Sequence, residues 1–118
     1  MGAHHGIDYV EIPVTDLAAA KAFYGRAFGW TFTDYGPQYA GFVDHARGDR
    51  EAGGLTVVAE VVPGGVLAVI YSDDLEASEA AVVAAGGQVT VPAFDFPGGR
   101  RFEFTDLDGH RWGVWTQP

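Results

Sequence analysis

The sequence predicts an α+β domain made of two copies of a βαβββ module, and two observations carry this prediction. Residues 12–30 recur as residues 70–88 at a spacing of 58, with several Ala, Asp, Leu and Gly positions matching. In each copy, one strand pattern is followed by a helix pattern and then by three more strand patterns. Two copies are too few, and the repeat is too long, for a repeat array. We therefore expect a single domain over residues 1–118, with modules at about residues 5–61 and 66–117.

The first module opens with a strand pattern at residues 7–14, where odd-numbered and even-numbered residues form two different faces. Thr15 or Asp16 can cap the following helix, because a short side chain bearing oxygen accepts hydrogen bonds from the free amides of the first turn. Apolar residues at helical spacing predict a helix over residues 17–29, and Gly29 is placed to end it.

The second module repeats this order with a strand at residues 66–72, a cap at Asp73 or Asp74, and a helix over residues 75–86. Three short strands are expected after each helix. They lie at residues 30–35, 38–45 and 53–61 in the first module and at residues 88–94, 100–106 and 110–117 in the second. The turn residues are Gly36-Pro37, Gly53-Gly54, Pro63-Gly64-Gly65, Pro97-Gly98-Gly99 and Asp108-Gly109. Gly86 and Gly87 are placed to end the second helix.

Composition excludes several classes of function. The net charge is −9, with only seven Lys and Arg residues, which disfavours nucleic acid as a partner because binding to phosphate draws on these cations. No apolar run approaches the length of a membrane span, and the first residues show no export signal, so we expect a cytoplasmic protein that does not bind membranes. The absence of cysteine excludes disulfides, thiolate nucleophiles and cysteine metal sites.

Two motifs carry a resemblance to a known family: the helix opening from Asp16 to Tyr24 and the hairpin from Asp106 to Trp112. With the tandem βαβββ order, they resemble the vicinal oxygen chelate superfamily, which includes glyoxalase I, extradiol dioxygenases and bleomycin-resistance proteins. The resemblance implies a curved, cup-shaped mixed sheet with helices outside, and a metal or ligand in the cup. It also implies a homodimer, because pairing of chains protects exposed sheet edges.

The resemblance further implies one metal ligand on the first and one on the last strand of each module. These positions fall on Tyr9 and Leu67, on Gly113, and on Gly54 or a neighbour. None offers the imidazole or carboxylate that divalent transition metals prefer. We therefore expect no metal cofactor, no other cofactor and no glyoxalase I activity.

The four histidines are poor candidates for catalysis. His4 and His5 are adjacent on a chain expected to be extended and flexible, so their rings would point to opposite sides. His45 falls in a polar, exposed loop, and His110 is expected to pack or hydrogen-bond beside the Asp106–Gly109 turn. That turn lacks the further ligands of a calcium loop, and the Gly-Gly pairs lack the residues of a phosphate loop.

Strand alternation places Glu11 on the same face as Tyr9, toward the cup, where a poorly hydrated carboxylate suits general acid or base work. The alternative is a structural ion pair with Arg111 or Arg101. Aromatic walls with a few polar groups are typical of a small-molecule pocket, whereas the same aromatics could also fill a closed cup. The expected lining is Tyr9, Glu11, Leu67, Val69, Tyr71, Arg111 and Trp115, with Arg101 or Phe102 added according to register.

Three functions follow from these patterns. The first is binding of a small organic molecule in the cup without a metal, with Tyr9, Tyr71 and Trp115 in contact. The second is catalysis, either by a metal-independent isomerase or lyase using Glu11 or by a metal-dependent lyase or dioxygenase whose ligands lie elsewhere. The third is a closed cup in a protein that acts through its surface. The missing ligands and the aromatic residues favour binding.

Overall fold

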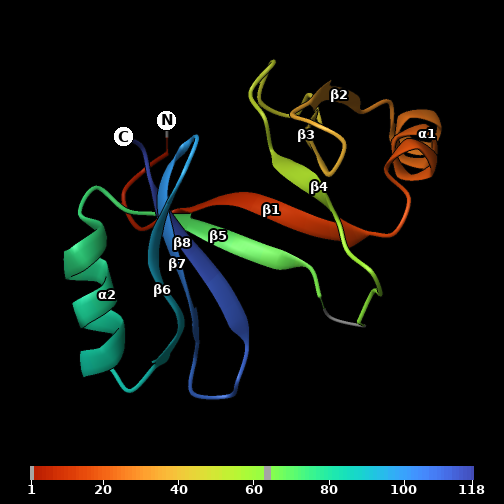
Figure 1. The fold of residues 1–118 in the computed structure, drawn as a ribbon. Helices are drawn as coiled ribbons and strands as arrows, with labels where there is room; N and C mark the ends of the chain where they lie inside the picture. Colours follow the sequence, from red (N-terminus) through yellow and green to blue (C-terminus); the bar gives the residue numbers. More distant parts are fainter. Residues whose placement is uncertain (1, 63–64) are drawn as a thin grey trace. The chain divides into compact units, whose positions relative to one another are not determined.

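The computed structural model describes residues 2–62 and 65–118, and it contains two compact units (Figure 1). The first unit comprises residues 9–66, and the second unit comprises residues 67–118 together with residues 1–8. Each unit has a strand, a helix and three strands in chain order, so the α+β class and the tandem βαβββ order are confirmed. The expected turn residues Pro63 and Gly64 lie outside the described residues.

The first unit has a mixed sheet in the order β2-β3-β4-β1, in which β1 and β4 are parallel and the other neighbours are antiparallel. Helix α1 packs against this sheet and contacts β2 and β4. The elements are β1 (Ile7–Val14), α1 (Leu17–Phe28), β2 (Thr31–Asp34), β3 (Tyr39–Val43) and β4 (Gly53–Val57).

Helix α1 begins and ends for local reasons. The Asp16 side chain accepts a hydrogen bond from the amide of Ala19 at 3.0 Å, so Asp16 rather than Thr15 is the N-cap. Gly29 has a φ of 73°, a left-handed conformation that glycine adopts without steric cost, and its amide donates to the carbonyl of Gly25.

The even-numbered face of β1 supplies the core of the first unit. Val14 is buried with Phe42 and Leu55, and Ile12, Leu17, Ala20, Tyr24 and Trp30 pack against this group. Trp30 stacks on Phe42 with ring centroids 4.4 Å apart. The odd-numbered face of β1 is therefore the face directed away from α1.

The second unit has the sheet order β5-β8-β7-β6, in which β5 and β8 are parallel and the other neighbours are antiparallel. Strand β6 lies at the edge of this sheet and tolerates Pro92, which cannot donate a ladder hydrogen bond. The elements are β5 (Leu67–Tyr71), α2 (Leu75–Ala84), β6 (Gln88–Phe96), β7 (Gly99–Thr105) and β8 (Arg111–Thr116).

Helix α2 begins at Asp74, whose side chain accepts from the amide of Ala77 at 3.1 Å. It ends two residues earlier than expected, at Ala84, because Gly86 adopts a φ of 97° and turns the chain. Leu75 is buried with Phe102 and Val114 in the core beneath α2. Figure 1 shows helix α2 beside strand β6. In the parts of the chain that the structure describes, no helix is long and apolar enough to span a membrane.

Candidate functional site

Five polar side chains meet on the face of the first unit that points away from α1. We call Tyr9, Glu11, Tyr35, Tyr39 and Glu51 the Tyr–Glu cluster. Strand β1 supplies Tyr9 and Glu11, and β3 supplies Tyr39. The Tyr35 amide donates to the carbonyl of Tyr39 at 2.9 Å, which closes the turn between β2 and β3. Glu51 lies just before β4, where the Ala52 backbone is bonded to both neighbouring strands.

Hydrogen bonds link the two carboxylates of the Tyr–Glu cluster through phenol groups. The Tyr9 hydroxyl donates to Glu51 Oε1 at 3.1 Å, and the Tyr35 hydroxyl donates to Glu51 Oε2. The Tyr39 hydroxyl lies 3.1 Å from Glu11 Oε2 and 3.3 Å from the Tyr9 hydroxyl. A continuous path of polar contacts therefore runs from Glu11 to Glu51.

Two paired glycines provide the space for this arrangement. Gly41 of β3 is opposite Gly54 of β4. A β-carbon at Gly54 would overlap the Tyr39 ring and hydroxyl, and one at Gly41 would overlap the Glu51 carboxylate. The absence of side chains at these two positions lets Tyr39 and Glu51 lie directly on the sheet, side by side.

The environment of the cluster keeps the phenols of Tyr9 and Tyr35 protonated. Burial raises the pKa of Tyr9 far above the usual range, and the neighbouring Tyr39 and Glu51 raise it further. The hydrogen bond to Glu51, aided by burial, also raises the pKa of Tyr35. Both phenols therefore remain hydrogen-bond donors at neutral pH.

The raised pKa of Tyr9 predicts a loss of stability in alkali. Below the unfolded-chain pKa of about 10, this contribution to stability is fully present. Above it, the unfolded chain releases the Tyr9 proton while the folded chain keeps it, so the free energy of unfolding falls by about 1.4 kcal/mol per pH unit until the folded pKa is reached. Urea unfolding between pH 9 and 11.5 should show a shallower decline in Tyr9→Phe than in the wild type or in Tyr24→Phe, which lies outside the cluster. Equal declines in all three proteins would contradict this assignment.

The other predicted site residues lie in the second unit. Leu67, Val69 and Tyr71 are buried along β5, and Val69 is opposite Gly113 of β8. A β-carbon at Gly113 would lie 3.4 Å from Arg101 Nη2. The Arg101 guanidinium thus lies beside Gly113, the position at which the family resemblance implies a metal ligand.

Register settles which of Arg101 and Phe102 shares this face. Phe102 is buried in the core beneath α2, so the alternative that added Phe102 to the predicted lining is wrong. Arg101 instead pairs with Glu103 at 3.2 Å, and Arg111 pairs with the same carboxylate at 3.0 Å. The exposed Arg111 is held as part of this ion-pair group.

Residues 2–8 are hydrogen-bonded to part of the predicted lining. The amide of His5 donates to the carbonyl of Tyr71 at 2.7 Å, and the amide of Tyr71 donates to the carbonyl of Gly6 at 3.0 Å. Trp115 donates through Nε1 to the buried Asp8 at 3.0 Å and packs edge-on against Tyr71. The polar group of Trp115 is therefore already satisfied within the second unit.

The expectation for His4 and His5 is wrong. Their rings stack with centroids 3.7 Å apart, because His5 has a φ of 63° and the chain is not extended there. His4 Nδ1 accepts from the amide of Asp73 at 2.8 Å, and His5 Nε2 lies 3.2 Å from the Ser78 hydroxyl. Both histidines attach the start of the chain to the second unit.

The remaining histidines are where the sequence predicts them. His45 is exposed, and its Nε2 lies 3.0 Å from the Thr31 hydroxyl. His110 lies beside the Asp106–Gly109 turn, where its amide donates to Asp106 at 2.9 Å. Within residues 2–62 and 65–118, no three His, Cys, Asp or Glu side chains are grouped to hold a metal ion.

The structure therefore divides the predicted site residues. Tyr9 and Glu11 come together in the Tyr–Glu cluster, and the other five lie in the second unit. A ligand that contacts both groups stays a prediction. Sequence reasoning missed Tyr35, Tyr39 and Glu51. Tyr39 and Gly41 lie on the same face of β3, and this pattern could have identified Tyr39 but neither of the other two residues.

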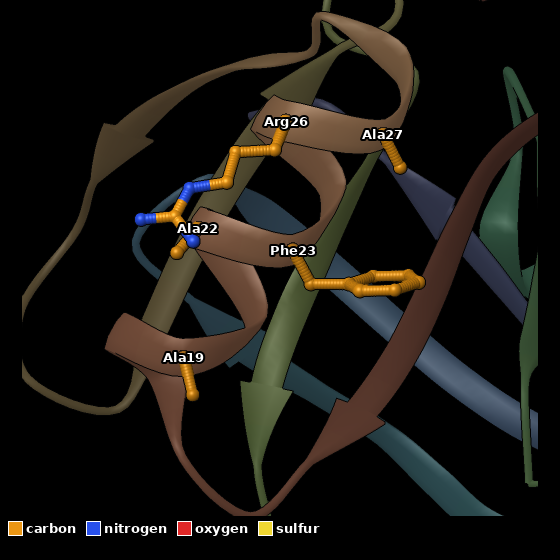
Figure 2. A pocket seen from close by; sticks show the side chains of 5 residues that line it. All are labelled: Ala19, Ala22, Phe23, Arg26 and Ala27. Atoms are coloured by element: carbon orange, nitrogen blue, oxygen red, sulfur yellow. The ribbon is translucent and has the colours of Figure 1, made fainter.

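A second feature of the first unit is a shallow hollow on the outer surface of α1. Figure 2 shows its lining, which consists of Ala19, Ala22, Phe23, Arg26 and Ala27. These residues offer apolar contact and one guanidinium, but no carboxylate, imidazole or hydroxyl. Of these two features, only the Tyr–Glu cluster therefore carries groups suited to acid–base chemistry.

Solved structures share this fold. The Mn(II)-bound glyoxalase of Novosphingobium aromaticivorans matches 96% of the chain and 39% of its own length, with a TM-score of 0.71 and 25% identity. Methylmalonyl-CoA epimerase of Mycobacterium tuberculosis matches 100% of the chain and 93% of its own length, with a TM-score of 0.76. At 16% identity, the second likeness shows the fold alone.

Sequence relatives point the same way. The chain is 35% identical over 117 residues to CFP32 of Mycobacterium bovis, a proposed glyoxylase; this match covers 92% of the chain and 44% of CFP32. It is 31% identical over 135 residues to a glyoxylase-like domain-containing protein of Didymella fabae, covering 100% of the chain and 98% of that protein. The chain thus spans less than half of the length of CFP32.

A family model also matches residues 6–114. The chain belongs to the family that this model describes, the Glyoxalase/Bleomycin resistance protein/Dioxygenase superfamily.

Proposed function

We propose that this chain is a glyoxalase-like protein that binds a small organic molecule at the Tyr–Glu cluster without a divalent metal ion. The observation that carries the proposal is the placement of three tyrosines and two glutamates on one sheet face, over two glycines that leave room for them. Aromatic surface with a few polar groups that converge is typical of small-molecule sites.

The chemistry of the donor positions supports the metal-free part of the proposal. Tyr9 is held protonated, and Leu67 is an aliphatic side chain. Tyr39 lies over Gly54, and Arg101 lies beside Gly113. A protonated phenol, an alkyl group and a cation do not fit a divalent ion, which needs deprotonated or neutral nitrogen, oxygen or sulfur ligands.

A ligand screen tests this function. A library of aromatic metabolites and drugs should contain a compound that raises the melting temperature of the wild type, because a ligand at 100 times its Kd stabilises by about 2.7 kcal/mol. Tyr39→Ala should weaken that compound at least tenfold, whereas Phe23→Ala, on the outer surface of α1, should leave its affinity unchanged. A screen without any compound that depends on Tyr39 would reject the proposal, and about one bound Ni, Zn or Fe per chain after chelator treatment would reject its metal-free part.

The second candidate function is metal-independent isomerase or lyase chemistry with Glu11 as the acid or base. The contact of Glu11 with the Tyr39 hydroxyl favours it, because the polar path to Glu51 could move a proton away from the carboxylate. Glu11→Gln separates the two functions: loss of turnover with retained binding would establish catalysis. Retained turnover would exclude this role for Glu11.

We also propose a homodimer, and the structure supports it through helix α1. None of the twelve residues of α1 is buried, and Phe23 and Phe28 are among the exposed apolar side chains. Apolar surface of this kind is favourable in an interface between chains. Light scattering at micromolar concentrations should give twice the chain mass of 12.6 kDa, and a mass near 12.6 kDa would contradict the dimer.

A further inference from the structure

We infer that the ligand of the Tyr–Glu cluster carries a protonated amine, which contacts the rings of Tyr35 and Tyr39 and the carboxylate of Glu51. This inference rests on the proposed function, because it names the class of molecule that the same site takes. It follows from three properties of the described residues: the use of the phenol protons, the position of the two rings, and the exposure of Tyr35.

The phenol protons of the cluster are already used. A tyrosine hydroxyl donates only one hydrogen bond. Tyr9 and Tyr35 both donate to Glu51, and the Tyr39 proton is directed to Glu11 or to the Tyr9 oxygen. Tyr35 and Glu51 therefore offer a ligand oxygen lone pairs and no hydrogen-bond donor. A partner that brings N–H donors satisfies these oxygens, whereas a carboxylate or phosphate does not.

The rings and the carboxylate lie close enough to act on one cation. The ring centroids of Tyr35 and Tyr39 are 6.4 Å apart, and the rings are inclined by 47°. Tyr39 lies over Gly54 and Glu51 lies over Gly41, and these glycines are direct cross-strand partners. A cation against an aromatic face is attracted by the ring quadrupole, and a carboxylate beside it adds charge.

A ligand can reach this position from solvent. Tyr35 is 59% exposed, and Tyr39 and Glu51 are half-buried. The partial burial strengthens the attraction between Glu51 and a cation, since the surrounding dielectric is lower than that of water. An anion would meet the same carboxylate without a free donor from the three phenols.

Three probes with the same aromatic ring separate the ligand classes. At pH 7, 2-phenylethylamine is a cation, 2-phenylethanol is neutral and 3-phenylpropionate is an anion. Titration calorimetry on the full chain should give the amine an affinity about tenfold higher than that of the alcohol, because a charged hydrogen bond is roughly twice as strong as a neutral one. The propionate should bind most weakly.

Substitutions then locate the cation. Glu51→Gln should weaken the amine about tenfold and leave the alcohol unchanged. Asp34→Asn removes one exposed carboxylate of the same unit, which pairs with Lys21 outside the cluster, so it controls for long-range charge and should leave the amine unchanged. Tyr35→Phe keeps the ring and should keep amine binding within about threefold.

The outcomes distinguish this inference from the proposed function. Tighter binding of the alcohol or the propionate overturns the cation class and leaves small-molecule binding intact. The same conclusion follows if none of the three probes binds but a screen compound binds in a way that depends on Tyr39. Amine binding that is insensitive to Glu51→Gln, or equally sensitive to Asp34→Asn, overturns the placement. Failure of the probes together with failure of the screen overturns both the inference and the proposed function.

Discussion

Gly53→Ala is expected to destabilise the protein by on the order of 3 kcal/mol, the largest effect of any single methyl group we predict. A β-carbon at residue 53 would overlap the backbone carbonyl oxygen of Val10 and would lie 2.6 Å from the Phe42 ring. Strands β1, β3 and β4 meet at this position, so the backbone itself would have to move. Urea unfolding followed by circular dichroism measures the loss.

Gly25→Ala is the matched control for Gly53→Ala. At residue 25, inside α1, a β-carbon would make ordinary contacts at 3.6 Å and beyond. Alanine is favoured over glycine in a helix by up to about 1 kcal/mol, so this variant should be slightly more stable than the wild type. A Gly53→Ala protein as stable as the wild type would show that β1 and β4 are not packed at the observed separation.

Gly54→Ala, one residue further along, should weaken ligand binding strongly while the protein stays folded. The added β-carbon would overlap the ring and hydroxyl of Tyr39, a side chain that can rotate away, and the opposite strand would not have to shift. Rotation of Tyr39 breaks its contacts with Glu11 and Tyr9 and removes one ring from the proposed site. We expect an affinity loss of tenfold or more with a change in unfolding free energy below about 1.5 kcal/mol.

Calorimetry with a ligand identified in the screen, beside urea unfolding of the same sample, checks both parts of the Gly54→Ala prediction. Gly41→Ala offers a second approach, since a β-carbon there would displace the Glu51 carboxylate in place of Tyr39. Wild-type affinity in both glycine variants would exclude the Tyr–Glu cluster as the binding site.

The sequence predicted the elements well wherever local chemistry decides them. Asp16 and Asp74 cap their helices through their own side chains, and Gly29 ends α1 in a left-handed conformation that few other residues adopt. The repeat between the modules strengthened the assignment of the two aspartate caps, which lie at matching positions. Strand ends were less accurate: β6 continues to Phe96, past the expected end at residue 94, because Gly99 allows β7 to begin directly after a tight turn.

The candidate site was only partly predictable. Tyr9 and Glu11 share a strand, so alternation alone places them on one face. Glu51 lies in an irregular segment, and its position over Gly41 depends on strand pairing that no local pattern encodes. The backbone pairing of Tyr71 with His5 and Gly6 is likewise a contact between distant parts of the chain.

The attachment of residues 2–8 to the second unit has a consequence for synthesis on the ribosome. Asp8 bonds Trp115, which is 107 residues later, and His5 reaches Ser78. During translation residues 2–8 leave the ribosome before Ser78 and Trp115 are made, so these contacts can form only after residues 9–66 have been synthesised. Closing so long a loop is slow, so we expect the pairing of residues 2–8 with the rest of the second unit to be a late step in folding.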